Sequence, residues 1–320
     1  MSEQRTEPDA RARHYGDFYG LTESAGASDS DAAVTLVVGN CQAESLRIFL
    51  EGGGLTTVRM PAVHELTPAD LPHLERWLGR TRLLVSQPVR DGYHGLPLGT
   101  AELARRLPTE ARVVRVPVIR FAGLYPAHVI VRPPSDLSLV PPLVEYHDVR
   151  LIAEAAGMPL PDDALTPDLV RSIAALSLAE LRQREAANET VVVSDLFDGS
   201  ARMPYFNQMR TLNHPGNPIW TALASRVRER LGLDDRVVDP GRPVLAGVHA
   251  PRERAVIEAW ELDDEPTDHW LVGDDRIGAD VVRRAHLAWY AEHPDAVSAA
   301  VARHADTLRL WGTSGRADAA

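Results

Sequence analysis

Short apolar runs alternate along this chain with segments of helical periodicity. Residues 34–38 form an apolar, β-branched run that ends at Gly39, which is the pattern of a buried strand. From Cys41 the period changes, because the apolar residues at 46, 49 and 50 recur at helical spacing. Glycines at 52–54 then stop the helix. The pattern predicts a strand, a turn and a helix over residues 34–54.

Similar cycles follow. The segment LTPADLPHLERWL (66–78) predicts a capped helix, RLLVSQPV (82–89) a strand, and GTAELARRL (99–107) a helix. RVVRVPVIRFAGLYP (112–126) predicts a third buried strand that runs into a turn. Strands that alternate with helices favour an α/β fold, in which helices cover both faces of a parallel sheet.

The pattern breaks at the proline-rich segment 132–143, and two helices are predicted inside an insertion at about 141–188. A fourth strand at 189–197 and a periodic helix at 217–232 follow. We therefore expect a flexible tail at 1–30, an α/β catalytic domain at 31–239 and a mainly helical C-terminal extension at 240–320. The extension is interpreted as a cap, a dimer arm or the binding site for half of a substrate.

Composition narrows the class of protein. The chain has 320 residues, 44% of them hydrophobic and 25% charged, and no apolar run long enough to span a bilayer. The polar first thirty residues lack the apolar stretch of a secretory signal, so a cytoplasmic location is expected. A net charge of −11 argues against a nucleic-acid surface. The composition leaves a homo-oligomer open.

The chain contains one cysteine, Cys41, which excludes an intrachain disulfide. Ligands in open α/β sheets bind at the carboxyl ends of the strands, where Cys41 falls. A helix N-terminus lowers the pKa of a thiol and offers backbone N–H groups to an oxyanion. Cys41 is therefore a candidate nucleophile. The alternative, that it is a small buried hydrophobic residue, stays open at this point.

A thiol nucleophile needs a base, and His214 is the first candidate. It lies in TLNHPGNPIW, a tight loop after the predicted fourth strand that can return to the same edge of the sheet as Cys41. Alternatively, it only caps local backbone. His147, in EYHDVR at the start of the inserted helices, is the second candidate, because a helical site facing the cleft would let it bind substrate or a cofactor phosphate. The histidines set aside as solvated helical residues are His73, His269, His286, His293 and His304.

A set of spaced motifs resembles the WcbI family of polysaccharide-biosynthesis proteins. The motifs are GNCQAESLR, SQPV, FAGLYP, YHDVRLIAEAAG and NHPGNPIW, and they cover roughly Val34 to Leu231. The resemblance implies a three-layer fold related to the SGNH hydrolases, binding of coenzyme A, and an acyltransferase that usually acetylates a sugar. The extension lies outside the resemblance and suggests a specialised member, in capsule synthesis or in a pathway to a glycosylated small molecule.

In that comparison GNC takes the place of the SGNH motif GDS, so Cys41 stands where the serine nucleophile would be and His214 takes the place of the late histidine. The usual aspartate three residues before the histidine is replaced by Thr211. The third member is open, since Asp195 or Asp198 could orient His214 or the pair could act without a carboxylate. Contacts to the oxyanion or the substrate are assigned to Asn40, Gln42, Gln87, His147 and Asn213.

Coenzyme A is expected as co-substrate, and arginines are expected to bind its phosphates because the chain has no lysine. The candidates are Arg47, Arg90 and Arg120. No CxxC pair, HExxH helix, GxGxxG or P-loop is present, so no metal site and no nucleotide fold is predicted. Two enzyme classes remain, an acyltransferase acting on a sugar or glycosylated small molecule and a cysteine-dependent esterase or thioesterase. The third hypothesis is a non-catalytic protein that binds coenzyme A or a glycan.

Overall fold

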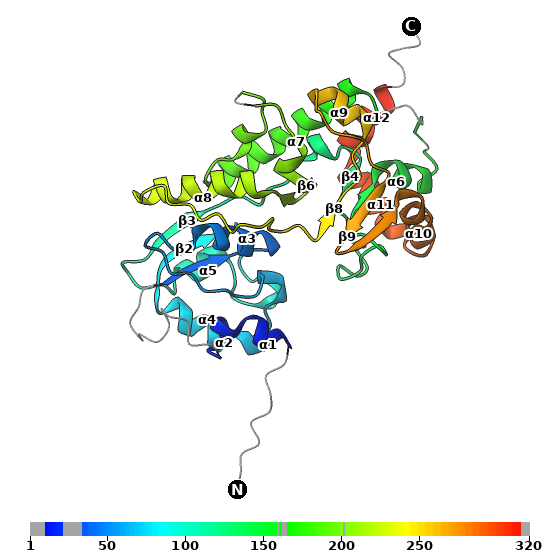
Figure 1. Cartoon of the computed structure of the whole chain (residues 1–320). Helices are drawn as coiled ribbons and strands as arrows, with labels where there is room; N and C mark the ends of the chain where they lie inside the picture. The colour runs from blue at the N-terminus through cyan, green and yellow to red at the C-terminus, as the bar shows by residue number, and fades with distance from the viewer. Residues whose placement is uncertain (1–9, 22–33, 159, 162–164, 201, 315–320) are drawn as a thin grey trace. The chain divides into compact units, whose positions relative to one another are not determined.

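A small parallel sheet organises the first part of the chain (Figure 1). In the computed structural model, which describes residues 10–21, 34–158, 160–161, 165–200 and 202–314, β1 (Val34–Val38), β2 (Thr81–Ser86) and β3 (Arg112–Arg115) pair in the order β1-β2-β3. Both pairings are parallel. The predicted mixed α/β fold with a parallel sheet is thus confirmed.

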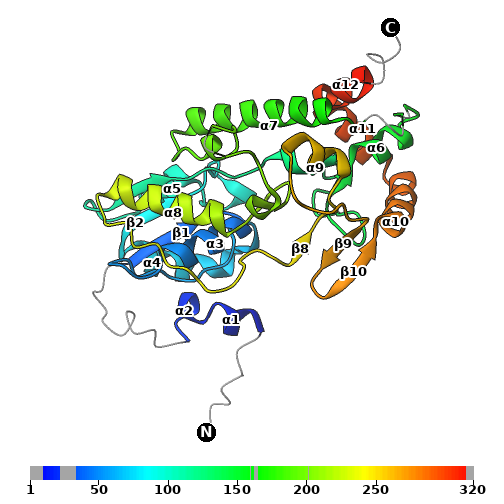
Figure 2. The same ribbon diagram turned by 45° about the horizontal axis from the view of Figure 1, so that its top comes forward.

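Helices cover this sheet. All five residues of β1 are buried, so both faces of the strand are packed against other elements. α3 (Cys41–Leu50) and α8 (Asn217–Leu231) lie side by side (Figure 2), while α4 (Leu71–Leu78) contacts β1. α5 (Thr100–Ala104) follows β2. The predicted helix that starts at Cys41 and stops before the glycines is confirmed.

Part of the expected loose tail is ordered. α1 (Ala10–His14) and α2 (Gly16–Tyr19) lie within it, and Phe18 is completely buried in the apolar cluster of β1 and α4. The Phe18 carbonyl accepts a hydrogen bond from the Trp77 indole at 2.9 Å. The prediction for these residues was wrong because one aromatic side chain finds a core position. The remaining tail residues lie outside the described part of the chain.

Two strand predictions were wrong. The third strand is regular only over Arg112–Arg115, and three of its four residues are exposed. The segment 189–197 was expected to be the fourth strand, but Val191 donates one hydrogen bond to the Arg115 carbonyl, at 2.8 Å, and the chain then leaves the sheet. The backbone N–H of Val193 instead donates to the Glu185 carboxylate at 2.7 Å. The Glu185 side chain therefore accepts the backbone hydrogen bond that Val193 would have donated to a neighbouring strand.

The remaining elements build a helical cluster and small antiparallel sheets. They are β4 (His128–Val129), β5 (His147–Asp148), α6 (Val149–Ala155), α7 (Pro167–Asn188), β6 (Met209–Thr211), β7 (His214–Pro215), β8 (Val248–His249), α9 (Arg254–Trp260), β9 (His269–Val272), β10 (Asp275–Gly278), α10 (Ala279–Glu292), α11 (Pro294–Arg303) and α12 (Ala305–Ser314). α10 and α11 pack against α6, and the core there includes Trp289, Tyr290 and Trp311. β8, β9 and β10 form an antiparallel sheet in the order β10-β9-β8. Single 3₁₀ turns occur at Val63–Glu65, Pro68–Asp70, Tyr93–Gly95, Ala122–Leu124, Ser194–Leu196 and Phe206–Gln208.

Contacts divide the chain into two compact units. The first unit comprises Met1–Val118, Arg184–Val193 and Asn217–Val244, and the second comprises Ile119–Gln183, Ser194–Gly216 and Leu245–Ala320. The domain boundaries expected near residues 31 and 240, and the insertion at about 141–188, stay predictions. Across the described residues, no helix combines the length and the hydropathy needed to cross a bilayer.

Candidate active site

The turn between β1 and α3 presents the thiol. Asn40 has extended backbone angles and caps the helix, because its side-chain oxygen accepts a hydrogen bond from the backbone N–H of Gln42 at 2.9 Å. Cys41 is the first helical residue, and it is exposed. The alternative of a buried hydrophobic cysteine is therefore excluded. A thiol in this position meets the positive end of the helix dipole, which favours its thiolate form.

Gln87, which follows β2, holds this turn in place. Its side-chain oxygen accepts a hydrogen bond from the backbone N–H of Asn40 at 2.9 Å, and its amide nitrogen donates to the Gln42 side-chain oxygen at 3.1 Å. A side chain at Gly39 would overlap the Gln87 carboxamide, so glycine at this position lets Gln87 approach the turn closely. The structure thus brings Asn40, Gln42 and Gln87 together beside Cys41. Their predicted roles toward an oxyanion or substrate stay predictions.

A small pocket of about 150 Å³ adjoins the thiol and is lined by Asn40, Cys41, Glu44, Arg47 and Arg59, among others. Arg47 and Arg59 both contact the Glu44 carboxylate, at 2.7 and 3.3 Å. Arg47 also contacts Glu51, at 3.3 Å. Arg47 therefore lies beside the thiol, where a residue that binds coenzyme A is expected, but the Glu44 and Glu51 carboxylates balance its charge. The sequence analysis missed Arg59.

His214 belongs to the second unit, in a short antiparallel hairpin made by β6 and β7. Thr211 pairs with His214 across this hairpin. Gly216 follows the hairpin, and a side chain there would overlap the Asn207 carbonyl, so the turn into α8 requires glycine. The histidine thus sits on a hairpin rather than in an open loop, and its backbone is held by neighbouring strand residues.

A network of hydroxyl and amide groups surrounds the His214 imidazole. The Tyr146 hydroxyl lies 3.2 Å from His214 Nε2 and donates to the Asn213 side-chain oxygen at 2.7 Å. The Thr211 hydroxyl donates to the Tyr146 oxygen at 2.8 Å. Thr211 occupies the position where the resemblance leads one to expect an aspartate, and it reaches the histidine through Tyr146. The sequence analysis named Asn213 but missed Tyr146.

Burial lowers the pKa of His214 to about 4, while the backbone of Val248 acts in the opposite direction. The imidazole is therefore neutral at neutral pH, as a proton acceptor must be. A base of so low a pKa holds an accepted proton weakly, so it suits a proton transfer in which the proton is passed on at once.

His147 is not where the sequence placed it. It lies in β5, before the helix, because Asp148 caps α6 through the backbone N–H of Arg150 at 2.8 Å. Its side chain is 1% exposed and contacts the Tyr290 hydroxyl at 2.8 Å and the Val131 carbonyl at 3.2 Å. Burial lowers its pKa to about 4. The helical placement was wrong, and a role in binding phosphate, still a prediction, would require a buried neutral ring to release both partners.

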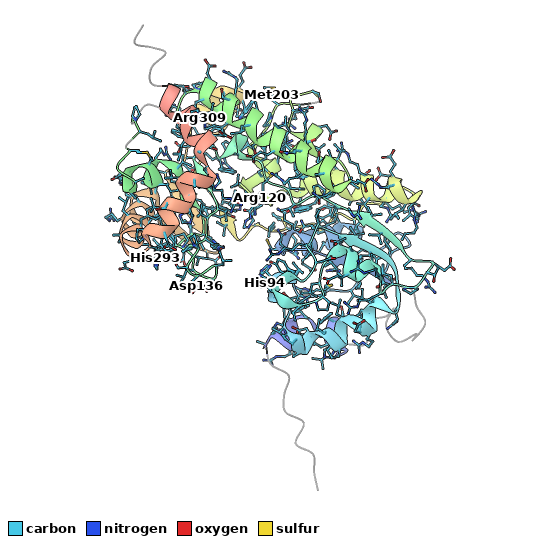
Figure 3. All side chains as sticks on the ribbon, turned by 180° about the vertical axis from the view of Figure 1, so that it is seen from behind. His94, Arg120, Asp136, Met203, His293 and Arg309 are labelled. Carbon is cyan, nitrogen blue, oxygen red and sulfur yellow. The ribbon has the colours of Figure 1, made fainter. Side chains whose placement is uncertain are left out.

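The other two arginine candidates lie apart in the chain. Arg90 lines a cavity of about 410 Å³ in the first unit, together with Pro88, Pro117 and Arg184. Arg120 (Figure 3) was expected in the third strand, but it follows β3 and belongs to the second unit. In the described part of the first unit, arginines therefore line a pocket at Cys41 and another cavity at Arg90.

The carboxylates of Asp195 and Asp198, expected as a third member of the catalytic set, stay predictions. Asp198 forms an ion pair with Arg182 at 2.8 Å, and Asp195 lies in a 3₁₀ turn. The group that contacts His214 Nε2 is the Tyr146 hydroxyl. Three of the histidines set aside as solvated helical residues differ from that prediction. His286 is fully buried, His269 lies in β9, and burial lowers the pKa of His304 to about 4, so these assignments were wrong. Within the described residues, no group of three or more metal-ligating side chains is found.

Comparisons with known proteins identify a matching family model and a similar solved structure. The family model described as "Polysaccharide biosynthesis enzyme WcbI" matches residues 34–236, which confirms the resemblance of the motifs. A solved structure of WcbI, described as a novel polysaccharide biosynthesis enzyme in native form without a disulfide bond between coenzyme A and a cysteine, has a TM-score of 0.74. It is 19% identical, and the match covers 89% of this chain and 98% of that chain. At this identity the likeness concerns the fold. No curated protein matches the sequence.

Proposed function

Since the chain belongs to the WcbI family of polysaccharide biosynthesis enzymes, we propose that it transfers an acyl group, most simply acetyl, from a coenzyme A thioester to a hydroxyl of a sugar or glycosylated small molecule. The observation that supports this most directly is Cys41, an exposed thiol at the start of α3 beside a pocket that contains two arginines. For the fold, we infer a three-layer relation to the SGNH hydrolases, with Cys41 in the place of their serine.

The proposed chemistry has two steps. Cys41 Sγ, as thiolate, bonds to the acyl carbon and displaces the thiolate of coenzyme A, which leaves an acyl thioester on Cys41. His214 then takes the proton of the acceptor hydroxyl while the acceptor oxygen bonds to the acyl carbon, and the Cys41 thiolate is released. The proton on His214 then passes through solvent to the released coenzyme A thiolate. The net result is an ester on the acceptor, free coenzyme A as a thiol, and the original enzyme with Cys41 as thiolate and His214 neutral.

Asn40 is assigned to the oxyanion that forms in each step. Its side-chain oxygen is used as the helix cap, so the NH₂ group on the other side of the same amide is the part that can donate to a ligand. Gln87 supports this arrangement by holding the Asn40 backbone N–H. In the proposal Gln87 positions the donor, and it does not itself contact the oxyanion.

Coenzyme A is assigned to the first unit. Arg47 and Arg59, which lie beside the thiol, suit the polar part of coenzyme A near its thioester. The cavity lined by Arg90 and Arg184 also has proline and valine in its walls, so it suits a phosphate of coenzyme A that lies next to an apolar group. Coenzyme A supplies the activated acyl group when it is bound. Arginine contacts to phosphate weaken as salt rises, so binding should show that dependence.

The test is to incubate the protein with acetyl-coenzyme A, with and without candidate sugars, and to follow both protein and sugars by mass spectrometry. We expect an acetyl group on the wild-type chain, none on Cys41→Ala, and acetylated sugar only when both substrates are present. Thiol release that needs no acceptor would assign the chain to the hydrolases. Binding of coenzyme A without any acylation would assign it to non-catalytic binding proteins.

A further inference from the structure

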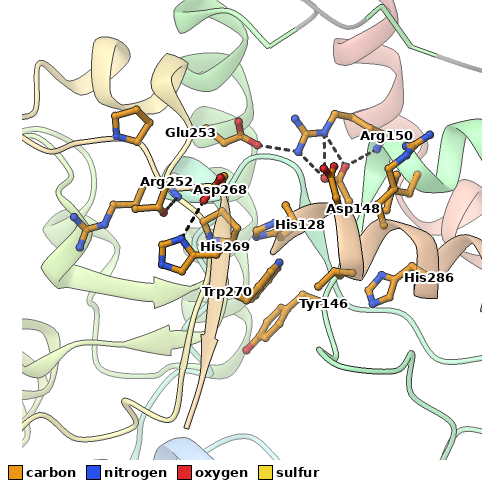
Figure 4. Close-up of a pocket in the computed structure, with 18 of the residues that line it drawn as sticks. His128, Tyr146, Asp148, Arg150, Arg252, Glu253, Asp268, His269, Trp270 and His286 are labelled. Carbon is orange, nitrogen blue, oxygen red and sulfur yellow. Dashed lines mark hydrogen bonds and ion pairs between the residues drawn. The ribbon is translucent and has the colours of Figure 1, made fainter. Parts of the chain in front are cut away.

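A large cavity lies entirely within the second unit (Figure 4). Its volume is about 1090 Å³, slightly above the range typical of small-molecule sites in proteins. Residues of β4, β5, β9 and α10 contribute to its walls, as does the segment that leads into α9. None of the residues proposed so far for coenzyme A lines it.

One wall is aromatic. The rings of Tyr146 and Trp270 stack at 5.5 Å with an interplanar angle of 18°, and the His128 ring lies 4.8 Å from Trp270. Figure 4 shows the three side chains together. Stacked rings have few accessible rotamers, so this wall is rigid, and aromatic walls with a few polar groups are typical of sites for organic ligands.

The charged groups of the cavity balance one another. Counting the described lining residues, five are arginines and five are aspartates or glutamates. Arg150 illustrates the arrangement, because it bridges Asp148 at 2.6 Å and Glu253 at 2.8 Å. A ligand with several phosphates would meet as many carboxylates as arginines. A neutral ligand with many hydroxyl groups can instead donate to the carboxylates and accept from the arginines.

His128 adds a group that suits a hydroxyl. Its side chain is 7% exposed, and burial lowers its pKa to about 4, so the ring is neutral and has one donor and one acceptor nitrogen. Within the described structure, its Nδ1 has no hydrogen-bond partner. An unpaired buried polar atom costs free energy, which a ligand hydroxyl that reached it would offset.

Tyr146 connects this cavity to the proposed base. Its side chain is part of the aromatic wall, and its hydroxyl lies 3.2 Å from His214 Nε2. Both residues belong to the second unit. His214 itself does not line the cavity, so Tyr146 is the residue that links a ligand bound there to the group proposed to remove a proton.

From these observations we propose that the cavity binds a neutral sugar through its vicinal hydroxyl groups, and that this sugar is the acceptor of the transfer reaction. The second clause rests on the proposed function. In this assignment Glu253 and Arg150 contact ring hydroxyls, and the aromatic wall limits the orientation of the sugar. Selectivity for the acceptor then resides in the second unit, whereas the thiol belongs to the first.

The experiment measures binding without turnover. Full-length Cys41→Ala protein is titrated with the methyl glycosides of glucose, mannose, galactose and N-acetylglucosamine, and binding is followed by saturation-transfer NMR. The same titrations are run after adding Glu253→Gln, which keeps the size of the side chain but removes its charge. Glu258→Gln is the matched control, because Glu258 is exposed on α9 and does not line the cavity. Thermal midpoints verify that each variant is folded.

We expect at least one glycoside to bind, with a Kd about tenfold higher in Glu253→Gln, as the loss of a charged hydrogen bond predicts, and unchanged in Glu258→Gln. Adenosine 3′,5′-bisphosphate should not displace the bound glycoside. The inference is overturned if none of the glycosides binds, if Glu253→Gln binds them as before, or if the bisphosphate competes. If wild-type Cys41 is acetylated but no glycoside binds, the assignment of the cavity fails and the proposed transferase function stands. If a glycoside binds but Cys41 is not acetylated, the transferase function fails and the cavity remains a sugar site.

Discussion

The hydroxyl of Tyr146 lies 3.2 Å from Nε2 of His214, although the two residues are 68 positions apart in the sequence. Thr211 and Asn213 share the same hydroxyl, at 2.8 and 2.7 Å. This contact supplies the histidine with a neutral partner, whereas the resemblance of the motifs led us to expect a carboxylate at position 211. It also accounts for how His214 can be oriented while burial keeps its imidazole uncharged.

Replacing Tyr146 with phenylalanine should therefore lower kcat by about tenfold and leave the KM for acetyl-coenzyme A unchanged, because a positioning contact is lost and no contact to the donor is touched. Tyr125→Phe is the matched control, since its buried hydroxyl donates to the Met209 carbonyl at 3.1 Å. Both variants should lose about 1 kcal/mol of stability. Equal turnover in the two variants would show that Tyr146 is only structural.

Cys41 should react with iodoacetamide faster at neutral pH than a cysteine in an unstructured peptide, because the start of α3 favours thiolate. Labelling is unambiguous because the chain has no other cysteine. Acetyl-coenzyme A added beforehand should protect the thiol. Labelling that becomes fast only after denaturation would contradict the exposed, activated thiol.

Asn40 offers a way to separate helix capping from oxyanion binding. Asn40→Ser keeps a capping oxygen and should leave the thermal midpoint near that of the wild type, whereas Asn40→Ala should cost about 1 kcal/mol of stability. Both variants lack the amide NH₂, so turnover should fall by about 10²-fold or more in both. Full activity in a stable Asn40→Ser protein would remove Asn40 from the oxyanion site.

Removing the base should affect both rate and pH dependence. His214→Ala should lower turnover by about 10²- to 10⁴-fold, and adding Cys41→Ala should cost little more, because members of one catalytic unit are not additive. The pKa of His214 near 4 places the acid limb of kcat/KM well below pH 6, and that limb should be missing in His214→Ala. A less stable His214→Ala protein with normal kinetics would show that His214 only stabilises the hairpin of β6 and β7.

Acid should destabilise the protein through its buried histidines. Burial lowers the pKa of His128, His147, His214 and His304 to about 4 in the folded state. In the unfolded chain the same side chains bind protons near the ordinary histidine pKa of about 6.5, so their contribution to stability is full above that pH and is lost as the pH falls toward 4. Each histidine should contribute up to about 1.4 kcal/mol per pH unit in this window.

Urea unfolding at pH 7, 6 and 5 measures this effect. The free energy of unfolding should fall steadily across the series, and the slope should be shallower in His304→Gln, which lacks one of these titrating side chains. His73→Gln is the control, because His73 lies on α4 of the first unit, whereas the four histidines named above belong to the second unit. A stability that does not change between pH 7 and 5 would contradict the prediction.

Much of the site around Cys41 was determined by the local sequence. The apolar run of β1, the capping residue Asn40 and the period of α3 involve neighbours within a few positions, so the strand, turn and helix could be predicted with the thiol at the helix start. The motifs also identified the family, which the match over residues 34–236 confirms. Cys41 and His214 were named from the same local patterns, and their pairing stays a prediction.

Only the tertiary structure decided which groups hold these residues. Gln87 reaches the Asn40 backbone across 47 positions, and the Glu185 carboxylate takes the Val193 N–H that the predicted fourth strand needed. In EYHDVR the sequence favoured His147, which is buried in β5 against Tyr290. Tyr146, just before β5, reaches His214 instead. Periodicity reports which face of an element is apolar, whereas the partner of a buried polar group depends on how distant segments pack, and that information is not local.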